Sequence, residues 1–132
     1  MASSDLARRL APLASKSTLL LTHRGRKSGK PYDVVIWFMV EGDTIYLETL
    51  NDRRQWVRNV KATPEVTLTI DGNKFTGRVQ PITDSAERVR VDNLTTRKYL
   101  AARILYFVTR PLVNFLPDRR AAFRVLLDSP SD

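Results

Sequence analysis

The sequence predicts a single, mainly β domain with some α-helix, in which antiparallel strands close into a barrel. A length of 132 residues is typical of one domain. Short runs rich in β-branched and aromatic residues fill most of the chain up to residue 82. Tight-turn signals, among them Glu41-Gly42-Asp43 and Asp71-Gly72-Asn73, separate these runs. Short strands joined by tight turns favour an antiparallel barrel over a parallel sheet with helical crossovers.

The elements are expected in the following order. Ser3-Ser4-Asp5 can cap an N-terminal helix within residues 1–17, which ends near Pro12 or Ser15. The barrel core is expected within residues 18–82. Its five strands are predicted over residues 18–22, 32–40, 44–49, 65–70 and 74–82.

Three further helices are expected. In residues 51–61 the apolar residues Trp56, Val57 and Val60 share one helical face, and Asn51 or Asp52 can cap the helix. The polar residues 85–99 are compatible with a helix, and residues 100–116 form the most apolar stretch. Asp118 is expected to cap a last helix through Phe123, Val125 and Leu126, which makes residues 84–127 largely helical.

Composition limits the possible functions. The net charge of +8, from 22 basic and 14 acidic residues, favours an anionic partner such as a phosphorylated cofactor, an anionic membrane or a nucleic acid. The absence of cysteine excludes disulfides and thiolate catalysis, and with His23 as the single histidine no dedicated zinc or haem site is expected. No secretory signal and no apolar run of about 18–20 residues is present, so we expect a cytoplasmic protein.

The turn between the first two strands is the first candidate site. It concentrates four cations with the Ser28 hydroxyl and two glycines, the cations being Arg24, Arg26, Lys27 and Lys30. Charged donors and approachable backbone N–H groups are what a phosphate requires. A solvated hairpin turn is the alternative interpretation. Ser28 has no evident base partner, so nucleophilic catalysis is not expected.

Residues 51–59 are the second candidate segment. Arg53, Arg54 and Arg58 add cations, Trp56 can offer an indole plane, and Asn59 can bond a heterocycle edge. In the alternative interpretation Trp56 belongs to the core and Asn59 braces the turn. For His23 we favour a polar strand end over a catalytic role. Because the sequence has no recognition helix and no interleaved aromatic and basic residues, nucleic acid is not the expected partner.

Two motifs carry a family resemblance. The first is Leu20-Leu21-Thr22 leading into Gly25-Arg26-Lys27-Ser28-Gly29-Lys30-Pro31, and the second is Trp56-Val57-Arg58-Asn59-Val60 with Ala62-Thr63-Pro64-Glu65-Val66. In this order and at this separation they resemble the deazaflavin-dependent nitroreductase family of the flavin/deazaflavin split β-barrel oxidoreductases. The resemblance covers roughly residues 18–79 and extends more loosely into the C-terminal part.

The resemblance implies a split β-barrel of the FMN-binding type and the cofactor F420, whose reduced form donates a hydride to quinones, nitro compounds or activated alkenes. It implies that the turn holds the cofactor's phosphate and tail, and that Trp56 and Asn59 lie close to the cofactor. The candidate cofactor-binding residues are therefore Arg26, Lys27, Ser28, Gly29, Lys30, Thr49, Arg53, Arg54, Trp56 and Asn59, with no catalytic side chain and no metal. The chain departs from the family at Tyr32, where a basic residue is usual. It departs again over residues 47–54, which replace a glycine-rich stretch and include Glu48.

The sequence thus predicts an F420H2-dependent reductase acting on a small, hydrophobic, electron-poor substrate. Two alternatives stay open: an FMN-dependent split-barrel oxidoreductase, and a non-catalytic barrel that carries a cofactor, haem or lipid. Residues 100–116, with Arg103 and Arg110, could form an amphipathic helix that lies on an anionic membrane. Packing on the barrel or against a second copy in a homodimer is the favoured alternative for this stretch.

Overall fold

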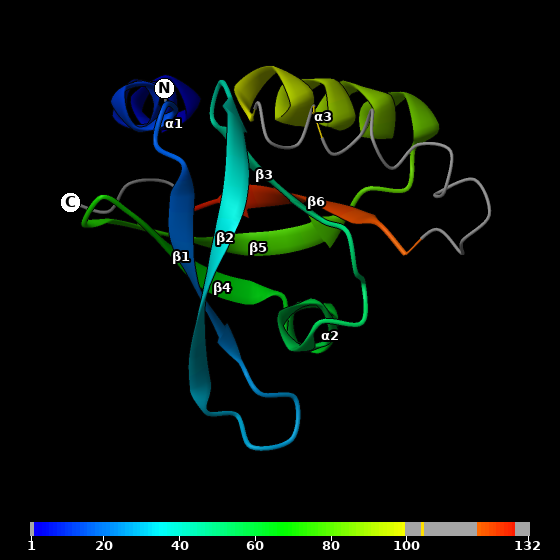
Figure 1. The fold of residues 1–132 in the computed structure, drawn as a ribbon. Helices are drawn as coiled ribbons and strands as arrows, with labels where there is room; N and C mark the ends of the chain where they lie inside the picture. Colours follow the sequence, from blue (N-terminus) through cyan, green and yellow to red (C-terminus); the bar gives the residue numbers. More distant parts are fainter. Residues whose placement is uncertain (1, 100–103, 105–118, 129–132) are drawn as a thin grey trace.

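Six antiparallel strands form a closed barrel in the order β1-β2-β3-β6-β5-β4 (Figure 1). The computed structural model describes residues 2–99, 104 and 119–128, and the side chains from Asp5 onward within them. The strands are β1 Thr18–Arg24, β2 Pro31–Glu41, β3 Thr44–Thr49, β4 Glu65–Ile70, β5 Asn73–Pro81 and β6 Ala121–Leu127. The described helices are α1 Ala2–Leu10, the 3₁₀ turn Ala11–Leu13, α2 Gln55–Ala62 and α3 Ser85–Lys98. The predicted barrel and its first five strands are confirmed.

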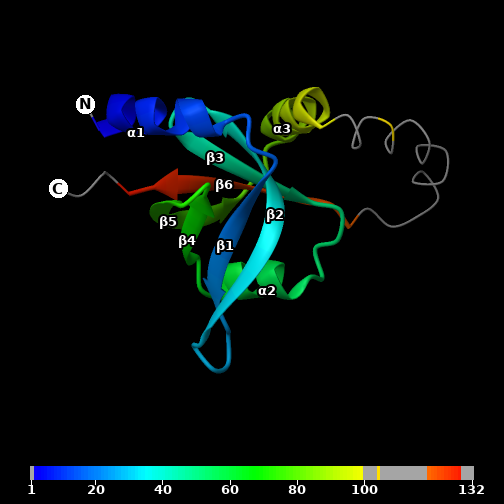
Figure 2. The same cartoon turned by 60° about the vertical axis from the view of Figure 1, so that its left-hand side comes forward.

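The barrel interior is filled by alternate residues of each strand. In β1, for example, Leu19, Leu21 and His23 are buried, whereas the residues between them are more exposed. This period of two is what places one face of a strand in the core. Helix α2 lies beside the lower part of the β1–β2 hairpin in both ribbon views (Figures 1 and 2). Its apolar face, with Val57 and Val60, completes the core at that end.

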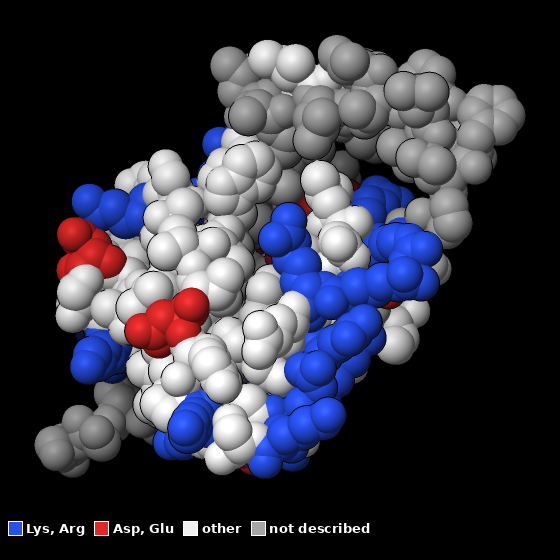
Figure 3. Space-filling view, turned by 60° about the horizontal axis from the view of Figure 1, so that its bottom comes forward, with Lys and Arg blue, Asp and Glu red and all other residues white. Residues whose placement is uncertain are grey.

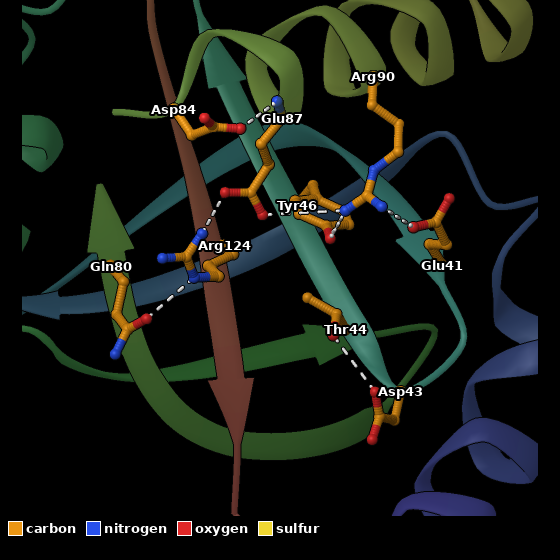
Figure 4. A network of polar contacts seen from close by, with 9 residues as sticks. All are labelled: Glu41, Asp43, Thr44, Tyr46, Gln80, Asp84, Glu87, Arg90 and Arg124. Carbon is orange, nitrogen blue, oxygen red and sulfur yellow. Dashed lines mark hydrogen bonds and ion pairs between the residues drawn. The ribbon is translucent and has the colours of Figure 1, made fainter. Parts of the chain in front are cut away.

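Helix α3 covers part of the outside of the barrel. A second apolar cluster lies beneath it and includes Met39, Tyr46 and Val91. A polar network fastens the helix to the sheet (Figure 4): the Arg124 guanidinium pairs with Glu87 and donates from Nε to Gln80 over 2.9 Å. Arg90 donates to the Tyr46 hydroxyl over 3.0 Å. Asp84 caps the start of the helix, because its carboxylate accepts from the Glu87 N–H at 2.9 Å.

The prediction of a last helix through Phe123, Val125 and Leu126 is wrong, because residues 121–127 form strand β6. Phe123 and Val125 point into the barrel, whereas Leu126 is exposed. β6 pairs with β3 on one side and β5 on the other, so it joins two strands that would otherwise have open edges. Closure of the barrel therefore outweighs the local helical pattern, and residues 84–127 are only partly helical.

Two cap predictions are also wrong. Arg54, not Asn51 or Asp52, precedes the first turn of α2, and it makes no side-chain cap bond. Asn51 instead accepts from the Arg53 N–H at 3.0 Å, which shapes the loop before the helix. The N-terminal helix already includes Ala2, so Ser3-Ser4-Asp5 lies inside it. The stretch 100–116 and the residue Asp118 lie outside the described residues. Within the described part of the chain, no helix has both the length and the apolar character to span a bilayer.

Candidate functional site

The turn between β1 and β2 is ordered by its own backbone. The Gly25 N–H donates to the Lys30 carbonyl over 2.9 Å, and the Gly29 N–H donates to the Gly25 carbonyl over 2.8 Å. Gly29 has a φ of +71°, a conformation that side chains disfavour, and the Ser28 hydroxyl accepts from the Lys30 N–H at 3.2 Å. A turn closed in this way presents the exposed side chains of Arg26, Lys27 and Lys30 to solvent.

Asn59 of α2 anchors this turn from below. Its side chain is 0% exposed, and its Oδ1 accepts from the Arg26 backbone N–H at 3.3 Å and from Arg26 Nη1 at 2.7 Å. Its Nδ2 lies 3.0 Å from Nδ1 of His23, which is also buried. Burial lowers the pKa of His23, although Asp33 opposes this effect. A neutral imidazole that accepts from the amide fits this pairing. The alternative in which Asn59 braces the turn is therefore what the geometry shows.

A second group of cations lies on α2 and the loop before it. Arg54, Arg58 and Lys61 are spaced by four and three residues, which places them on one helical face. Arg53 is exposed beside them. Seen from the end of the barrel that carries the turn and α2, basic side chains form a band along one side of a hollow (Figure 3). Within the described residues, none of these four side chains, nor Lys27 or Lys30, makes an ion pair.

Tyr32 packs against the turn where a basic residue is usual in the family that the sequence resembles. A Cβ built on Gly25 would lie 2.7 Å from Ser28 Oγ and 2.8 Å from Tyr32 Cε2, so only glycine leaves room for both neighbours. The Tyr32 ring also lies near the ring of His23, with 6.1 Å between centroids. The tyrosine therefore supports the shape of the turn rather than its charge.

Two of the predicted site residues lie away from the basic surface. Trp56 is buried in the barrel and meets Phe123 edge-on, with 5.7 Å between ring centroids. This position favours the interpretation in which Trp56 belongs to the core over the one in which its indole plane lies beside the cofactor. Thr49 is buried at the end of β3, where its hydroxyl accepts from the Asn51 N–H at 3.2 Å. Thr49 thus supports the loop that carries Arg53 and Arg54.

An aromatic surface lies on the outside of β2. Trp37 is 40% exposed and stacks on Tyr99, with 4.3 Å between centroids and 3° between ring planes. The Tyr99 hydroxyl donates to the carbonyl of Phe38 at 2.8 Å and holds the pair in place. Lys98 donates to the same carbonyl at 2.8 Å, and burial lowers its pKa to about 8. Sequence reasoning missed this surface because Tyr99 and Trp37 are far apart in the chain.

The arrangement can bind an anion but contains no evident nucleophile. The donor set, with its uncompensated cations around a glycine-containing turn, fits the phosphate of a flavin-type cofactor. The sequence analysis identified the cations of the two candidate segments, which are Arg24, Arg26, Lys27, Lys30, Arg53, Arg54 and Arg58. It left out Lys61, which the helical spacing from Arg54 and Arg58 could have indicated.

Comparisons with known proteins concern the family and the fold. Residues 4–105 match the model of the F420H(2)-dependent quinone reductase family. Among solved structures, an F420-H2 dependent reductase superposes with a TM-score of 0.66 at 20% identity, over 84% of this chain and 95% of the other. The haem storage protein HutZ from Vibrio cholerae has a TM-score of 0.70 at 14% identity, over 95% and 92% of the two chains.

A putative pyridoxamine 5'-phosphate oxidase from Listeria innocua has a TM-score of 0.64 at 13% identity, over 94% of each chain. At these identities the solved structures show a shared split-barrel fold. A search of curated protein sequences finds no match.

Proposed function

The chain belongs to the F420H2-dependent quinone reductase family, and from this we propose that it transfers a hydride from reduced F420 to a quinone, nitro compound or activated alkene. The family assignment makes the protein an F420-dependent oxidoreductase. The finer proposal concerns the substrate and the residues that hold the cofactor.

The anchored basic turn is the observation that supports cofactor binding at this place. Arg26, Lys27, Ser28, Gly29 and Lys30 would hold the phosphate-bearing tail of F420 through charged side chains and backbone N–H groups. Arg53 and Arg54 would add charge from the loop before α2. The bonds from the buried Asn59 fix the direction of Arg26 before any ligand arrives, which lowers the ordering cost of binding.

F420 in its reduced form supplies the hydride, so the protein's task is to bind, orient and exclude water. The deazaflavin ring and the substrate both need a flat, apolar surface. The stacked pair of Trp37 and Tyr99 offers one, with its exposed face on the outside of β2. We propose that this surface contacts the ring system or the hydrophobic substrate.

A haem-carrying function is disfavoured by the only histidine. His23 is 3% exposed, and its Nδ1 lies 3.0 Å from the amide of Asn59. A side chain held in this way cannot serve as an axial ligand without breaking the bond that anchors the turn. FMN also carries a phosphate, and only direct competition between the two cofactors separates these possibilities.

The test is a fluorescence titration of the protein with F420 and, separately, with FMN, on wild type, Lys27→Ala and Lys74→Ala. Lys74 is a matched control because it is an exposed lysine on β5, outside the turn and α2. We expect preference for F420 and a loss of about tenfold in affinity for Lys27→Ala, since a hydrogen bond to a charged group contributes about 1.5–3 kcal/mol before screening. Lys74→Ala should bind like wild type. Equal affinity of all three proteins would contradict the phosphate assignment, and preference for FMN would favour the FMN-dependent alternative.

A further inference from the structure

The single histidine of the chain lies beneath the basic turn, and the proposed function gives it no task. His23 is the penultimate residue of β1 and is 3% exposed. Its Nδ1 lies 3.0 Å from Nδ2 of Asn59, which is 0% exposed. Oδ1 of the same amide accepts from the Arg26 backbone N–H at 3.3 Å and from Arg26 Nη1 at 2.7 Å. A chain of hydrogen bonds thus connects the buried imidazole to the turn.

The orientation of the Asn59 amide follows from its two neighbours. Arg26 offers only donors here, because neither a guanidinium group nor a backbone N–H can accept a hydrogen bond. The amide oxygen must therefore face Arg26, and the amide NH2 group faces His23. Nδ1 of His23 must then accept, so the imidazole is neutral and its proton is on Nε2. The contacts are compatible with this tautomer alone.

The surroundings of His23 agree with a neutral ring. Burial lowers the pKa of His23, and the smaller effect of Asp33 on β2 raises it. Asp33 is itself exposed and accepts from the Thr22 hydroxyl at 2.6 Å. Tyr32 lies opposite His23 on β2, with 6.1 Å between ring centroids. The charged side chains closest along β1, α2 and β4 are exposed, namely Arg24, Arg58, Lys61 and Glu65.

Protonation of His23 would place two competing demands on the Asn59 amide. A protonated imidazole carries a hydrogen on both nitrogens, so Nδ1–H would face the NH2 group of Asn59. Both of these side chains are buried and must find partners in the protein, whereas Arg26 is exposed and can bond to water instead. The amide is therefore expected to rotate by half a turn, to present Oδ1 to His23 and to release Arg26.

We propose that His23 is a positioning residue for the cofactor: the neutral ring holds Asn59 in the orientation that supports Arg26, and protonation of the ring releases the turn and weakens binding of F420. His23 acts through Asn59 and touches no ligand itself. Since binding and protonation then oppose each other, the affinity for F420 should fall with decreasing pH. This inference rests on the proposed function and adds a regulation of the same site.

The first experiment measures the tautomer and the titration of His23 without cofactor. The protein, without a histidine tag, is labelled with ¹⁵N in the imidazole, and its single histidine gives one pair of ring-nitrogen signals. We expect the proton of the neutral ring on Nε2 and a titration midpoint below 6.5. In Asn59→Ala the preference for this tautomer should weaken, because Nδ1 has lost its donor. A proton on Nδ1, or a ring that stays neutral at every pH at which the protein is folded, would overturn the proposal.

The second experiment measures the affinity for F420 by calorimetry at several pH values, with folding checked by circular dichroism. We expect the wild-type affinity to fall about tenfold as the pH decreases through the midpoint of His23, because binding must then order the turn. His23→Asn places a non-titrating amide oxygen near the position of Nδ1, where it can accept from Asn59 at every pH. It should bind F420 without this decline. The ratio of the two affinities removes the titration of F420 itself, which is common to both proteins.

Asp33→Asn shifts the titration and leaves the chain of hydrogen bonds intact. It keeps an acceptor for the Thr22 hydroxyl but removes the charge that raises the pKa of His23. The midpoint measured by NMR and the decline in affinity should both move to lower pH. Asp71→Asn is the matched control, since it removes an exposed charge from the turn between β4 and β5, and it should move neither. A midpoint that moves while the affinity profile stays in place would contradict the coupling.

The two proposals fail in different ways. A decline in affinity that wild type and His23→Asn share would overturn the role of His23 alone. The same holds for an affinity that rises as the pH falls, which is the result expected if a bound phosphate only attracted the charged imidazole. A wild-type protein that binds no F420 at any pH would overturn the proposed function and this inference together.

Discussion

Asn59→Ala is the substitution that tests the site most directly. It removes the acceptor for the Arg26 backbone N–H and for Arg26 Nη1, and it leaves Nδ1 of the buried His23 without a partner. A neutral hydrogen bond contributes about 1 kcal/mol and one to a charged group about 1.5–3 kcal/mol. Because Asn59 is 0% exposed, water cannot easily replace these partners. We expect the free energy of unfolding to fall by about 3 kcal/mol, within the range of severe single substitutions.

The assay combines urea denaturation with F420 titration under conditions in which the variant is folded. We expect affinity to drop about tenfold, because Arg26 loses its orientation and binding must then order the turn. Asn59→Asp is the matched comparison: it keeps the acceptor for Arg26 but replaces the amide donor to His23 with a carboxylate. An unfolding free energy within about 1 kcal/mol of wild type and an unchanged affinity for F420 in Asn59→Ala would refute the reasoning.

The stability of wild type and that of Asn59→Asp should depend on pH in opposite directions. In wild type the pKa of His23 is lowered in the folded protein, so the unfolded chain binds a proton more readily, and stability should fall as pH decreases through the unfolded value of about 6.5. In Asn59→Asp a carboxylate beside the imidazole raises that pKa. Stability should then be greatest between the pKa of the new carboxylate and the unfolded histidine value of about 6.5, and it should decline as pH rises through the new pKa of His23. Parallel stability curves for the two proteins would contradict the assigned His23–Asn59 bond.

Two further substitutions test the turn and the last strand. Gly25→Ala places a methyl group within 2.8 Å of both Ser28 Oγ and the Tyr32 ring. Because both are ends of exposed side chains that can shift, we expect the free energy of unfolding in urea to fall by about 1 kcal/mol and F420 to bind more weakly. Wild-type affinity for F420 would show that this close packing is dispensable. Val125→Asp buries a carboxylate in the barrel and should lower the free energy of unfolding by more than about 4 kcal/mol. Leu126→Asp, on the exposed face of the same strand, should lower it by less than about 1 kcal/mol. Similar thermal denaturation of both variants would contradict the inward direction of Val125.

The sequence predicts the first five strands because their signals are local. Gly42 and Gly72 adopt positive φ angles in the turns that their neighbours indicate. The sixth strand is different, because Phe123 and Leu126 also match a helical spacing. What decides its conformation is the open edge of β3 and of β5, and edge pairing is a property of the whole sheet. The spacing of two between Phe123 and Val125 is the local signal that favours a strand.

The candidate site was likewise predictable from the sequence only where the signal is local. The cations of the turn are visible in the sequence because charge and glycine content are local properties. The bond between Asn59 and Arg26 is not, since 33 residues separate them and only the docking of α2 brings them together. Trp56 stands in the same motif as Asn59 yet points into the core, and the motif alone does not distinguish their surroundings.

The same division bears on Tyr32, which stands where the resemblance leads us to expect a basic residue. Attraction between exposed charges and an anionic ligand extends over about 8–10 Å at ordinary ionic strength, so a cation can be replaced by one on a neighbouring element. Arg58 and Lys61 on α2, together with Arg54 directly before it, offer such replacements. A buried hydrogen bond has no comparable freedom, because a shift of a fraction of an ångström breaks it. Cations from more than one element can therefore serve this site, whereas Asn59 must lie where it meets Arg26. Loss of one surface cation should accordingly weaken binding and leave the free energy of unfolding nearly unchanged, whereas loss of Asn59 should lower both.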